Sequence, residues 1–487
     1  MPSLDSELAS APLALSESPQ SKPGAAEIRL SEVIAAMSYA LDITEGQPQG
    51  HAARTCLIGM RIAQEIKLPL SDQSALFYGL LLKDLGCSSN AAKMCYLFGA
   101  DDRQVKHDIK TIDWPKMTAS IQFVQSHVAP TGTPLERLLK IVSMAIQGPA
   151  GPKRLVQTRC ERGSSIARQL GFPEATAIAI HQLDEHWNGK GHPQGLKGEQ
   201  ISPLARIMGL AQTLEVFVSQ HGLLAAIEVA QERRGRWFDP ELVDAFLAMR
   251  DDHEFWRRVH HPNPHLQVAA FEPFDAALIA DEPQLDMIAA AFAQVVDAKS
   301  PWTFKHSTRV AGISVGIGEI LGFGPQELRE IRRAGLLHDI GKLGVSNTIL
   351  DKPGKMTDDE FTELKKHPAF TEQIVGRVAG LGQMAQLAAA HHEKLDGRGY
   401  HRGILAGSLP LSARLLSVAD IFEALSAARP YRDALPLEKI YEIMDRDAGV
   451  AICAESYAAL KTWVDRNAFK DRIDDQIEGV ERLVAEI

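Results

Sequence analysis

Apolar residues recur at helical spacing along nearly the whole chain. From Ile28 onward they return three or four positions apart, and short segments with glycine and proline separate one run from the next. Strand-like alternation of apolar and polar residues is almost absent. The pattern therefore predicts an all-α protein. Residues 1–27 do not share it, because they are rich in serine, proline and alanine, and we expect this segment to be disordered.

The sequence also repeats itself, which indicates two helical bundles in tandem. His51 and Asp84 are 33 residues apart, and so are His306 and Asp339. Around these pairs LLLKDLG parallels LLHDIGK, and further on LDEHWNGKGHP parallels HHEKLDGRGYH. Such extended self-similarity predicts that the two copies share one fold.

The repeat sets the expected domain boundaries. We expect one domain over 28–258 and a second over 284–487, joined by a His-rich linker over 259–283. Positions 84 and 159 of the first copy are 75 residues apart, whereas the matching positions 339 and 367 are 28 apart, so the first copy carries 47 extra residues. We place this insertion at about 88–158, and its pattern does not indicate a role.

Composition and charge exclude some classes of partner. Apolar residues make up 45% and charged residues 23% of the 487 positions, and the net charge of −10 argues against a broad nucleic-acid-binding surface. The five cysteines form no CxxC pair, so we expect buried free thiols. No apolar run reaches the roughly 18 residues that span a bilayer, and the N-terminus lacks the basic start of a signal peptide. We expect a cytoplasmic protein without a membrane partner, whose amphipathic residues 474–487 pack on the body or on another protein.

Histidines and aspartates in the second half carry the candidate chemistry. His338 and Asp339 end an apolar helical run in LLHDIGK. Further candidates follow in KHSTR, KKHPAF, AAAHH and VADIF, namely His306, His367, His391, His392 and Asp420. Imidazoles and carboxylates suit a divalent Fe, Mn, Zn or Ni site. A carboxylate such as Asp339 can bridge two ions, and a two-metal clamp suits phosphoester cleavage.

The order of these motifs resembles the HD-GYP branch of the HD phosphohydrolase superfamily. HDIGK, KKHPAF, HHEKLDGRGYH and ARLLSVADIFEALSAARPYR occur in family order between Leu285 and Tyr441. One position departs from the signature, because Gly399-Tyr400-His401 carries histidine where the family has proline. Proline fixes its own φ, so we expect this loop to be looser and turnover to be lower than with proline.

The resemblance implies a binuclear site with two divalent ions, Fe or Mn. The implied ligands are His306, His338, Asp339 and Asp420 for one ion, and Asp339, His367, His391 and His392 for the other. Some family members bind a third ion through a glutamate four residues before the first histidine. Trp302 stands at that position here, so we expect two ions rather than three.

The resemblance also implies roles in catalysis and substrate binding. Asp339 bridges the ions, and Lys342 reaches the phosphate or the leaving oxygen. Arg429 and Arg432 bind phosphate oxygens, for which guanidinium groups are suited, and Tyr400 contacts a guanine base. We therefore expect a metal-dependent phosphodiesterase that cleaves a cyclic dinucleotide, with cyclic di-GMP as the expected substrate. A non-catalytic nucleotide sensor or signalling scaffold, and an HD hydrolase of another phosphoester, stay as alternatives.

The first copy keeps the apolar pattern of a helical core but loses most of the ligands. Only His51 and Asp84 remain. The substituted positions are Lys83 for His338, Cys87 for Lys342, Arg159 for His367, Leu183 for His391, Asp184 for His392 and Gln212 for Asp420. A lysine at position 83 adds positive charge and so opposes metal binding. We expect a metal-free first domain that pairs with the second as an intramolecular pseudo-dimer, and a homodimer of the whole chain stays open.

Overall fold

The computed structural model confirms the all-α prediction. It describes residues 28–112, 117–130, 132–147, 150–273, 279–378, 380–429 and 432–466, and these residues form helices joined by turns and isolated bridges, without a named strand. The segments expected to be disordered (1–27) and amphipathic (474–487) lie outside the described residues. No described helix is long and apolar enough to cross a bilayer. All five cysteines are free thiols, and four of them are buried.

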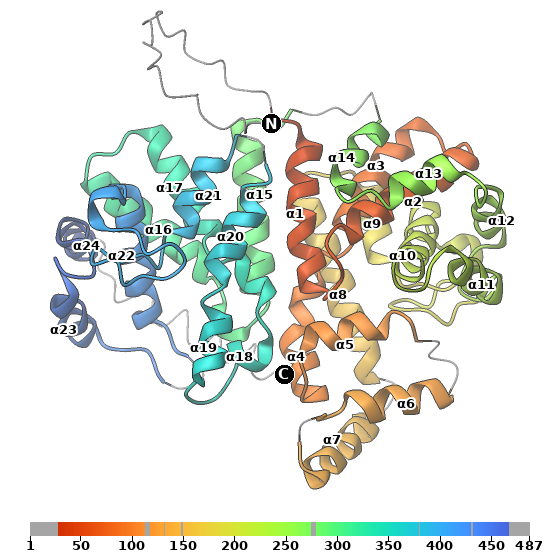
Figure 1. Cartoon of the computed structure of the whole chain (residues 1–487), viewed down its shortest axis with the longest axis horizontal. Helices are drawn as coiled ribbons and strands as arrows, with labels where there is room; N and C mark the ends of the chain where they lie inside the picture. The colour runs from red at the N-terminus through yellow and green to blue at the C-terminus, as the bar shows by residue number, and fades with distance from the viewer. Residues whose placement is uncertain are drawn as a thin grey trace, which may run out of the picture.

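Each half contains the same succession of helices (Figure 1). In the first half they are α1 (Leu30–Thr44), α2 (His51–Glu65), α3 (Leu70–Leu82), α8 (Ala150–Gln169), α9 (Glu174–His181), α10 (Pro203–His221), α11 (Leu223–Arg233) and α12 (Pro240–Ala248). Their counterparts are α15 (Glu282–Asp297), α16 (His306–Ile320), α17 (Pro325–Leu337), α20 (His367–Val375), α21 (Gly382–Ala389), α22 (Leu411–Ser426), α23 (Leu437–Asp447) and α24 (Ala454–Arg466). In both halves the second helix packs against the third and against the long central helix, α10 or α22.

The two halves contact each other reciprocally. Helix α1 packs against α20 and against the short helix η6 (Ile340–Gly344), which directly follows Asp339. Helix α15 makes the matching contacts with α8 and with η1 (Cys87–Asn90). Figure 1 shows α1 and α20 side by side at the centre of the molecule. One continuous apolar core runs through both halves, so burial of apolar surface holds them together.

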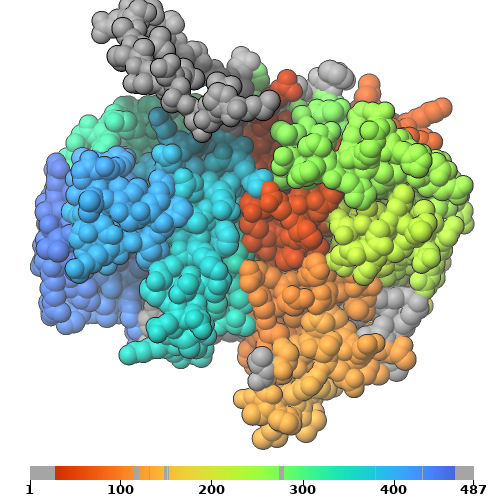
Figure 2. Space-filling model, in the orientation of Figure 1, coloured from red at the N-terminus to blue at the C-terminus, as the bar shows by residue number. Residues whose placement is uncertain are grey.

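The insertion forms a helical projection at one end of the first half (Figure 2). Its helices are α4 (Ala91–Phe98), α5 (Asp102–Ile109), α6 (Met117–His127) and α7 (Pro134–Gln147), and they share a small apolar core of their own. Helix α4 also packs against α18 (Asn347–Leu350) of the second half. The buried Asp102 accepts a hydrogen bond from the Asn347 backbone N–H at 3.1 Å, and Arg103 donates to the carbonyl of Gly344. The insertion therefore joins the two halves.

The segment expected to be a linker carries secondary structure of its own. Helices α13 (His253–Val259) and α14 (Pro264–Val268) lie in and beside it, and α14 packs against α2 with Val268 buried. Pro264 stands at the first position of its helix, where the missing N–H costs nothing, so this proline starts the helix.

Candidate metal centre

The predicted ligands converge in the second half because six of the seven lie at or just beyond the ends of helices. His306 and His367 open α16 and α20, and the pair His338-Asp339 directly follows α17. His391 and His392 follow α21, and Asp420 lies within α22. These helices pack against one another in the bundle, and this packing brings the side chains at their ends together. All seven are buried except His392, which is partly exposed.

One group of donor atoms surrounds the Oδ2 side of Asp339. Nε2 of His306 lies 3.2 Å from Asp339 Oδ2, and Nε2 of His338 lies 3.3 Å from it. Asp420 Oδ1 lies 3.5 Å and 3.7 Å from the same two nitrogens. Atoms that each bind one ion at about 2.1 Å are separated by about these distances. Both nitrogens are buried without a hydrogen-bond partner among the described residues, so a cation fits between these donors.

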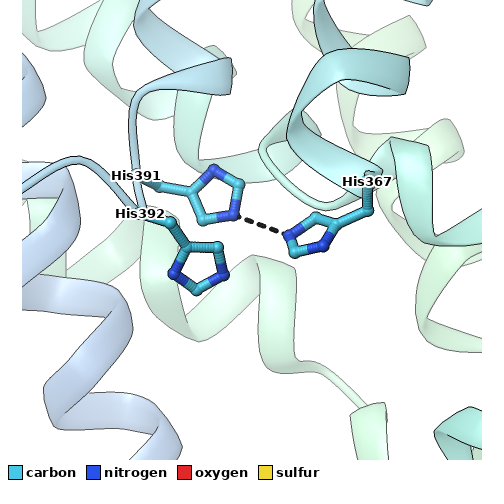
Figure 3. Close-up of side chains that lie close together, drawn as sticks. All are labelled: His367, His391 and His392. Atoms are coloured by element: carbon cyan, nitrogen blue, oxygen red, sulfur yellow. Dashed lines mark hydrogen bonds between the residues drawn. The ribbon is translucent and has the colours of Figure 1, made fainter. Parts of the chain in front are cut away.

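A second group faces the other oxygen of Asp339. Its Oδ1 lies 3.4 Å from His367 Nε2 and 3.7 Å from His391 Nε2. The two Nε2 atoms are 3.0 Å apart, and Figure 3 shows His367, His391 and His392 gathered at this point. Each ring donates Nδ1–H to a backbone carbonyl, that of Leu364 or Ala388, so each Nε2 presents a lone pair. Two facing lone pairs repel unless a cation lies between them, which makes this a second candidate metal position.

Partners on the far side of each ring fix its orientation. Nδ1 of His338 donates to the carbonyl of Gly335 at 2.8 Å. Nδ1 of His306 contacts the carboxylate of Glu423, which Arg309 also binds through Nε at 2.6 Å. Such second contacts hold the unprotonated nitrogen toward a metal. Four of the five histidines are thus preset as ligands.

The electrostatics of the site favour a bound cation. Burial lowers the pKa of His367 to about 3 and that of His392 to about 4, so both rings are neutral donors at pH 7. Burial alone would also lower the pKa of His338, but the carboxylates of Asp339 and Asp420 outweigh it and raise the pKa to about 10. These carboxylates therefore attract positive charge, as either a proton or a metal ion.

The residues expected to bind substrate lie at different distances from the ligands. Lys342 pairs with Asp339 Oδ2 at 2.5 Å. The Tyr400 ring lies 4.5 Å from the ring of His392. Arg429 lies beside Glu423, the carboxylate that contacts His306, and its Nη2 is 3.6 Å from the Glu423 carboxylate. The guanidinium of Arg432 instead donates to the carbonyls of Ala424 and Leu425 near the end of α22 and to that of Asp433.

Two glutamates that support the site were missed from the sequence. Glu423 lies three residues after Asp420, and Glu393 follows His392 directly. The Glu393 carboxylate accepts backbone N–H groups of Arg402 and Ile404 at 2.8 and 2.9 Å, and so holds the loop that carries the signature. A glutamate stands at the matching position of the first copy in both cases, at Glu215 and Glu185. This agreement between the two copies was the signal in the sequence that could have identified them.

The first half repeats this support but places cations among the donors. His51 contacts Glu215 through Nδ1, as the matching pair does in the second half. Lys83 Nζ lies 3.0 Å from His51 Nε2 and also donates to Asp84. Lys110, contributed by the insertion, lies 4.0 Å from the other oxygen of Asp84. Ammonium groups therefore supply positive charge at the place where the second half presents its candidate metal positions.

Comparisons with known proteins agree with this geometry. The HD domain family matches residues 149–242 and 290–452, a stretch in each half. The 3'3'-cGAMP-specific phosphodiesterase 3 of Vibrio cholerae serotype O1 is 43% identical over 432 residues, which cover 89% of this chain and 94% of that protein. A cyclic di-GMP phosphodiesterase of Thermotoga maritima is 38% identical over 151 residues, which cover 30% of this chain and 40% of that protein.

A solved structure extends the match to the whole arrangement. The crystal structure of a cyclic GMP-AMP specific phosphodiesterase of V. cholerae (V-cGAP3) matches with a TM-score of 0.63 at 38% sequence identity. The match covers 90% of this chain and 98% of that one, so it includes both halves. Together with the HD motif and its buried donor groups, these matches show that the chain belongs to the HD domain family, and within it to the HD-GYP phosphodiesterases of cyclic dinucleotides.

Proposed function

We propose that this chain hydrolyses 3'3'-cGAMP at the metal centre of its second half. The relative with that specificity in its name matches along both halves, over 89% of the chain. The T. maritima cyclic di-GMP phosphodiesterase matches 30% of the chain. Sequence reasoning alone led us to expect cyclic di-GMP, which becomes the competing substrate in the test.

The observation that carries the catalytic proposal is the division of ligands around Asp339. Its Oδ2 faces His306 and His338, whereas its Oδ1 faces His367 and His391. A carboxylate with imidazoles at both oxygens is suited to bridge two ions. We propose two divalent ions, completed by Asp420 and His392, and imidazole with carboxylate favours Fe or Mn over metals that prefer thiolates.

The chain's own residues bind and orient the substrate around these ions. Bound metal ions would activate water and offset charge on the phosphoryl oxygens. We propose that Lys342 transfers its contact from Asp339 to the phosphate or the leaving oxygen, and that Arg429 binds a phosphate oxygen. Tyr400, beside His392, contacts a nucleotide base. The contacts of Arg432 suit a different role, which is to hold the loop after α22.

The test compares hydrolysis of 3'3'-cGAMP and cyclic di-GMP by the full-length protein loaded with Mn²⁺ or Fe²⁺. We expect kcat/KM to be at least about tenfold higher for 3'3'-cGAMP, since a site built around specific base contacts rejects a wrong base by more than this. Arg429→Ala should raise KM about tenfold by removing a charged phosphate contact. Arg446→Ala is the matched control, because that side chain is 69% exposed and lies on α23.

The outcomes separate the choice of base from the reaction. A higher kcat/KM for cyclic di-GMP would overturn the choice of 3'3'-cGAMP and leave the reaction in place. Metal-loaded protein that binds either nucleotide and cleaves neither would overturn the proposed reaction and favour the sensor alternative.

A further inference from the structure

The loop that carries Tyr400 packs closely against the turn that contains His392 and Glu393. A Cβ on Gly399 would lie 2.5 Å from Cα of Glu393 and 2.6 Å from the carbonyl oxygen of His392, so only glycine fits there. The backbone N–H of Tyr400 donates to that same carbonyl at 3.3 Å. The position of Tyr400 relative to the ligands therefore depends on the backbone conformation of the residues that follow it.

His401, which directly follows Tyr400, has a backbone conformation that proline cannot adopt. Its φ is +103°, in a region that residues with a side chain rarely occupy. Proline is confined to a φ near −65°. The histidine at this position therefore goes with a differently shaped loop, and it is not a simple loss of the signature proline.

A single carboxylate holds this strained residue and the one after it. Oε2 of Glu372 accepts a hydrogen bond from His401 Nε2 at 2.6 Å. The same oxygen contacts Arg402 through Nε at 3.2 Å and Nη2 at 2.8 Å. The side chains of His401 and Glu372 are 17% and 31% exposed, so the contact is partly shielded from water.

The carboxylate belongs to a helix that also carries a metal ligand. Glu372 lies on α20, which begins with His367. Tyr400 packs on His392, with ring centroids 4.5 Å apart. The contact between Glu372 and His401 thus ties the loop bearing Tyr400 to the helix bearing His367, and it fixes the distance between the base-contacting ring and the metal ligands.

We propose that Glu372 is a positioning residue that clamps His401 and Arg402, and that this clamp performs in this chain the stiffening that proline provides in the signature. It sets where Tyr400 meets the nucleotide base. The inference rests on the proposed function, since the role of Tyr400 is assigned there. It also replaces our expectation from the sequence that histidine at 401 loosens the loop.

The test uses four full-length, metal-loaded variants. Glu372→Ala removes the whole clamp, and His401→Pro removes both the histidine contact of the clamp and the required φ. His401→Gly keeps the φ and leaves Arg402 as a partner of Glu372. Glu363→Ala is the matched control, because Glu363 is an exposed residue that pairs with the exposed Lys366.

We expect KM for 3'3'-cGAMP to rise in the order His401→Gly, Glu372→Ala, His401→Pro, with a rise of about tenfold for Glu372→Ala, as is usual when a substrate-positioning contact is lost. All four variants should keep the metal content of the wild type. The control Glu363→Ala should also keep its KM. A KM for His401→Pro at or below the wild-type value would overturn the proposal. So would a KM for Glu372→Ala equal to that of the control.

Hydrogen exchange of the loop keeps this test independent of the substrate. We expect the backbone amides of residues 397–404 to exchange faster in Glu372→Ala than in the wild type, since exchange reports local opening. This result supports the clamp even if the wild type cleaves no cyclic dinucleotide, which would overturn only the proposed function. Unchanged exchange in Glu372→Ala would overturn the clamp whatever the activity.

Discussion

Nζ of Lys83 lies 3.0 Å from Nε2 of His51, at the sequence position that His338 occupies in the second copy. In the second half the corresponding pair is two imidazole nitrogens that have no hydrogen-bond partner within the described part of the chain, whereas here an ammonium group donates to the imidazole and to Asp84. A fixed cation repels a metal ion and at the same time satisfies the buried carboxylate. In the first half an internal ammonium group therefore supplies the positive charge that the donor atoms of the second half are suited to receive from a metal ion.

Metal content should depend on Asp339 and be indifferent to its counterpart Asp84. We expect about two divalent ions per chain, as in a two-metal hydrolase site. Asp339→Asn should lose both ions, because it removes the charge that both share. Elemental analysis of purified protein measures this, with Asp84→Asn as the matched control. Retention of both ions by Asp339→Asn, or loss of an ion in Asp84→Asn, contradicts the assignment.

Replacing the internal cation should destabilise the protein. Lys83→Met leaves the buried Asp84 without its closest partner, and we expect a loss of about 3 kcal/mol in the free energy of unfolding, typical of a broken buried ion pair. Urea unfolding at pH 7 measures the loss. Lys439→Ala, at a lysine that is 50% exposed, should change stability by less than about 0.5 kcal/mol. Equal stability of the two variants would show that Lys83 does not compensate Asp84.

The ion pair around Glu215 predicts a pH dependence of stability. Burial alone would raise the pKa of this carboxyl, but His51 and Arg54 outweigh it and lower the pKa from 4.5 to about 2. The folded state then binds fewer protons than the unfolded state between these values, so the stabilisation is present above pH 4.5 and is lost as the pH falls toward 2. Glu215→Gln cannot ionise and lacks it.

We expect Glu215→Gln to be less stable than the wild type by about 2 kcal/mol at pH 7, the value of a hydrogen bond to a charged group. The difference should shrink below pH 4.5. Denaturant unfolding of both proteins at pH 7, 4 and 3 measures it. A difference that stays constant over this range contradicts the ionised state of Glu215.

The contact between the halves should contribute to stability through Asp102. Its carboxylate is fully buried and lies 3.6 Å from both Lys106 of the first half and Lys299 of the second. Asp102→Asn should cost about 3 kcal/mol, because two buried ammonium groups lose their shared counter-charge. Thermal unfolding measures this against Asp244→Asn, whose side chain is 57% exposed. Equal melting temperatures would show that this cluster does not hold the halves together.

A fragment of residues 282–487 tests the same contact at full scale. Without α1, the helices η6 and α20 lose their apolar neighbour, and η6 carries Lys342. We therefore expect the fragment to melt at a lower temperature than the full chain and to have a lower kcat/KM. If the fragment is monomeric and matches the full chain in both quantities, the first half is not a structural partner of the second.

The sequence by itself determined the helical class, the repeat and which residues are candidate ligands. Helical spacing of apolar residues is a local property, and the equal separation of His51 from Asp84 and of His306 from Asp339 is visible without a structure. The candidate ligands could be named because a family motif places them in a fixed order along the chain, and the structure brings their side chains together. The prediction that the first copy holds no metal ion rests on Lys83, because its positive charge opposes a cation wherever the two groups lie.

Tertiary structure alone decided which distant groups meet. Glu372 and His401 are 29 residues apart, and Lys110 reaches Asp84 from an insertion without counterpart in the second copy, so neither contact leaves a local pattern. The φ of His401 depends on how its loop packs against the turn that contains His392 and Glu393. This packing overrides the intrinsic preference of a residue with a side chain for negative φ. Periodicity specifies where a helix begins and ends, whereas the partner of each side chain is set by how helices stack, because burial of apolar surface is not directional and acts on the whole chain at once.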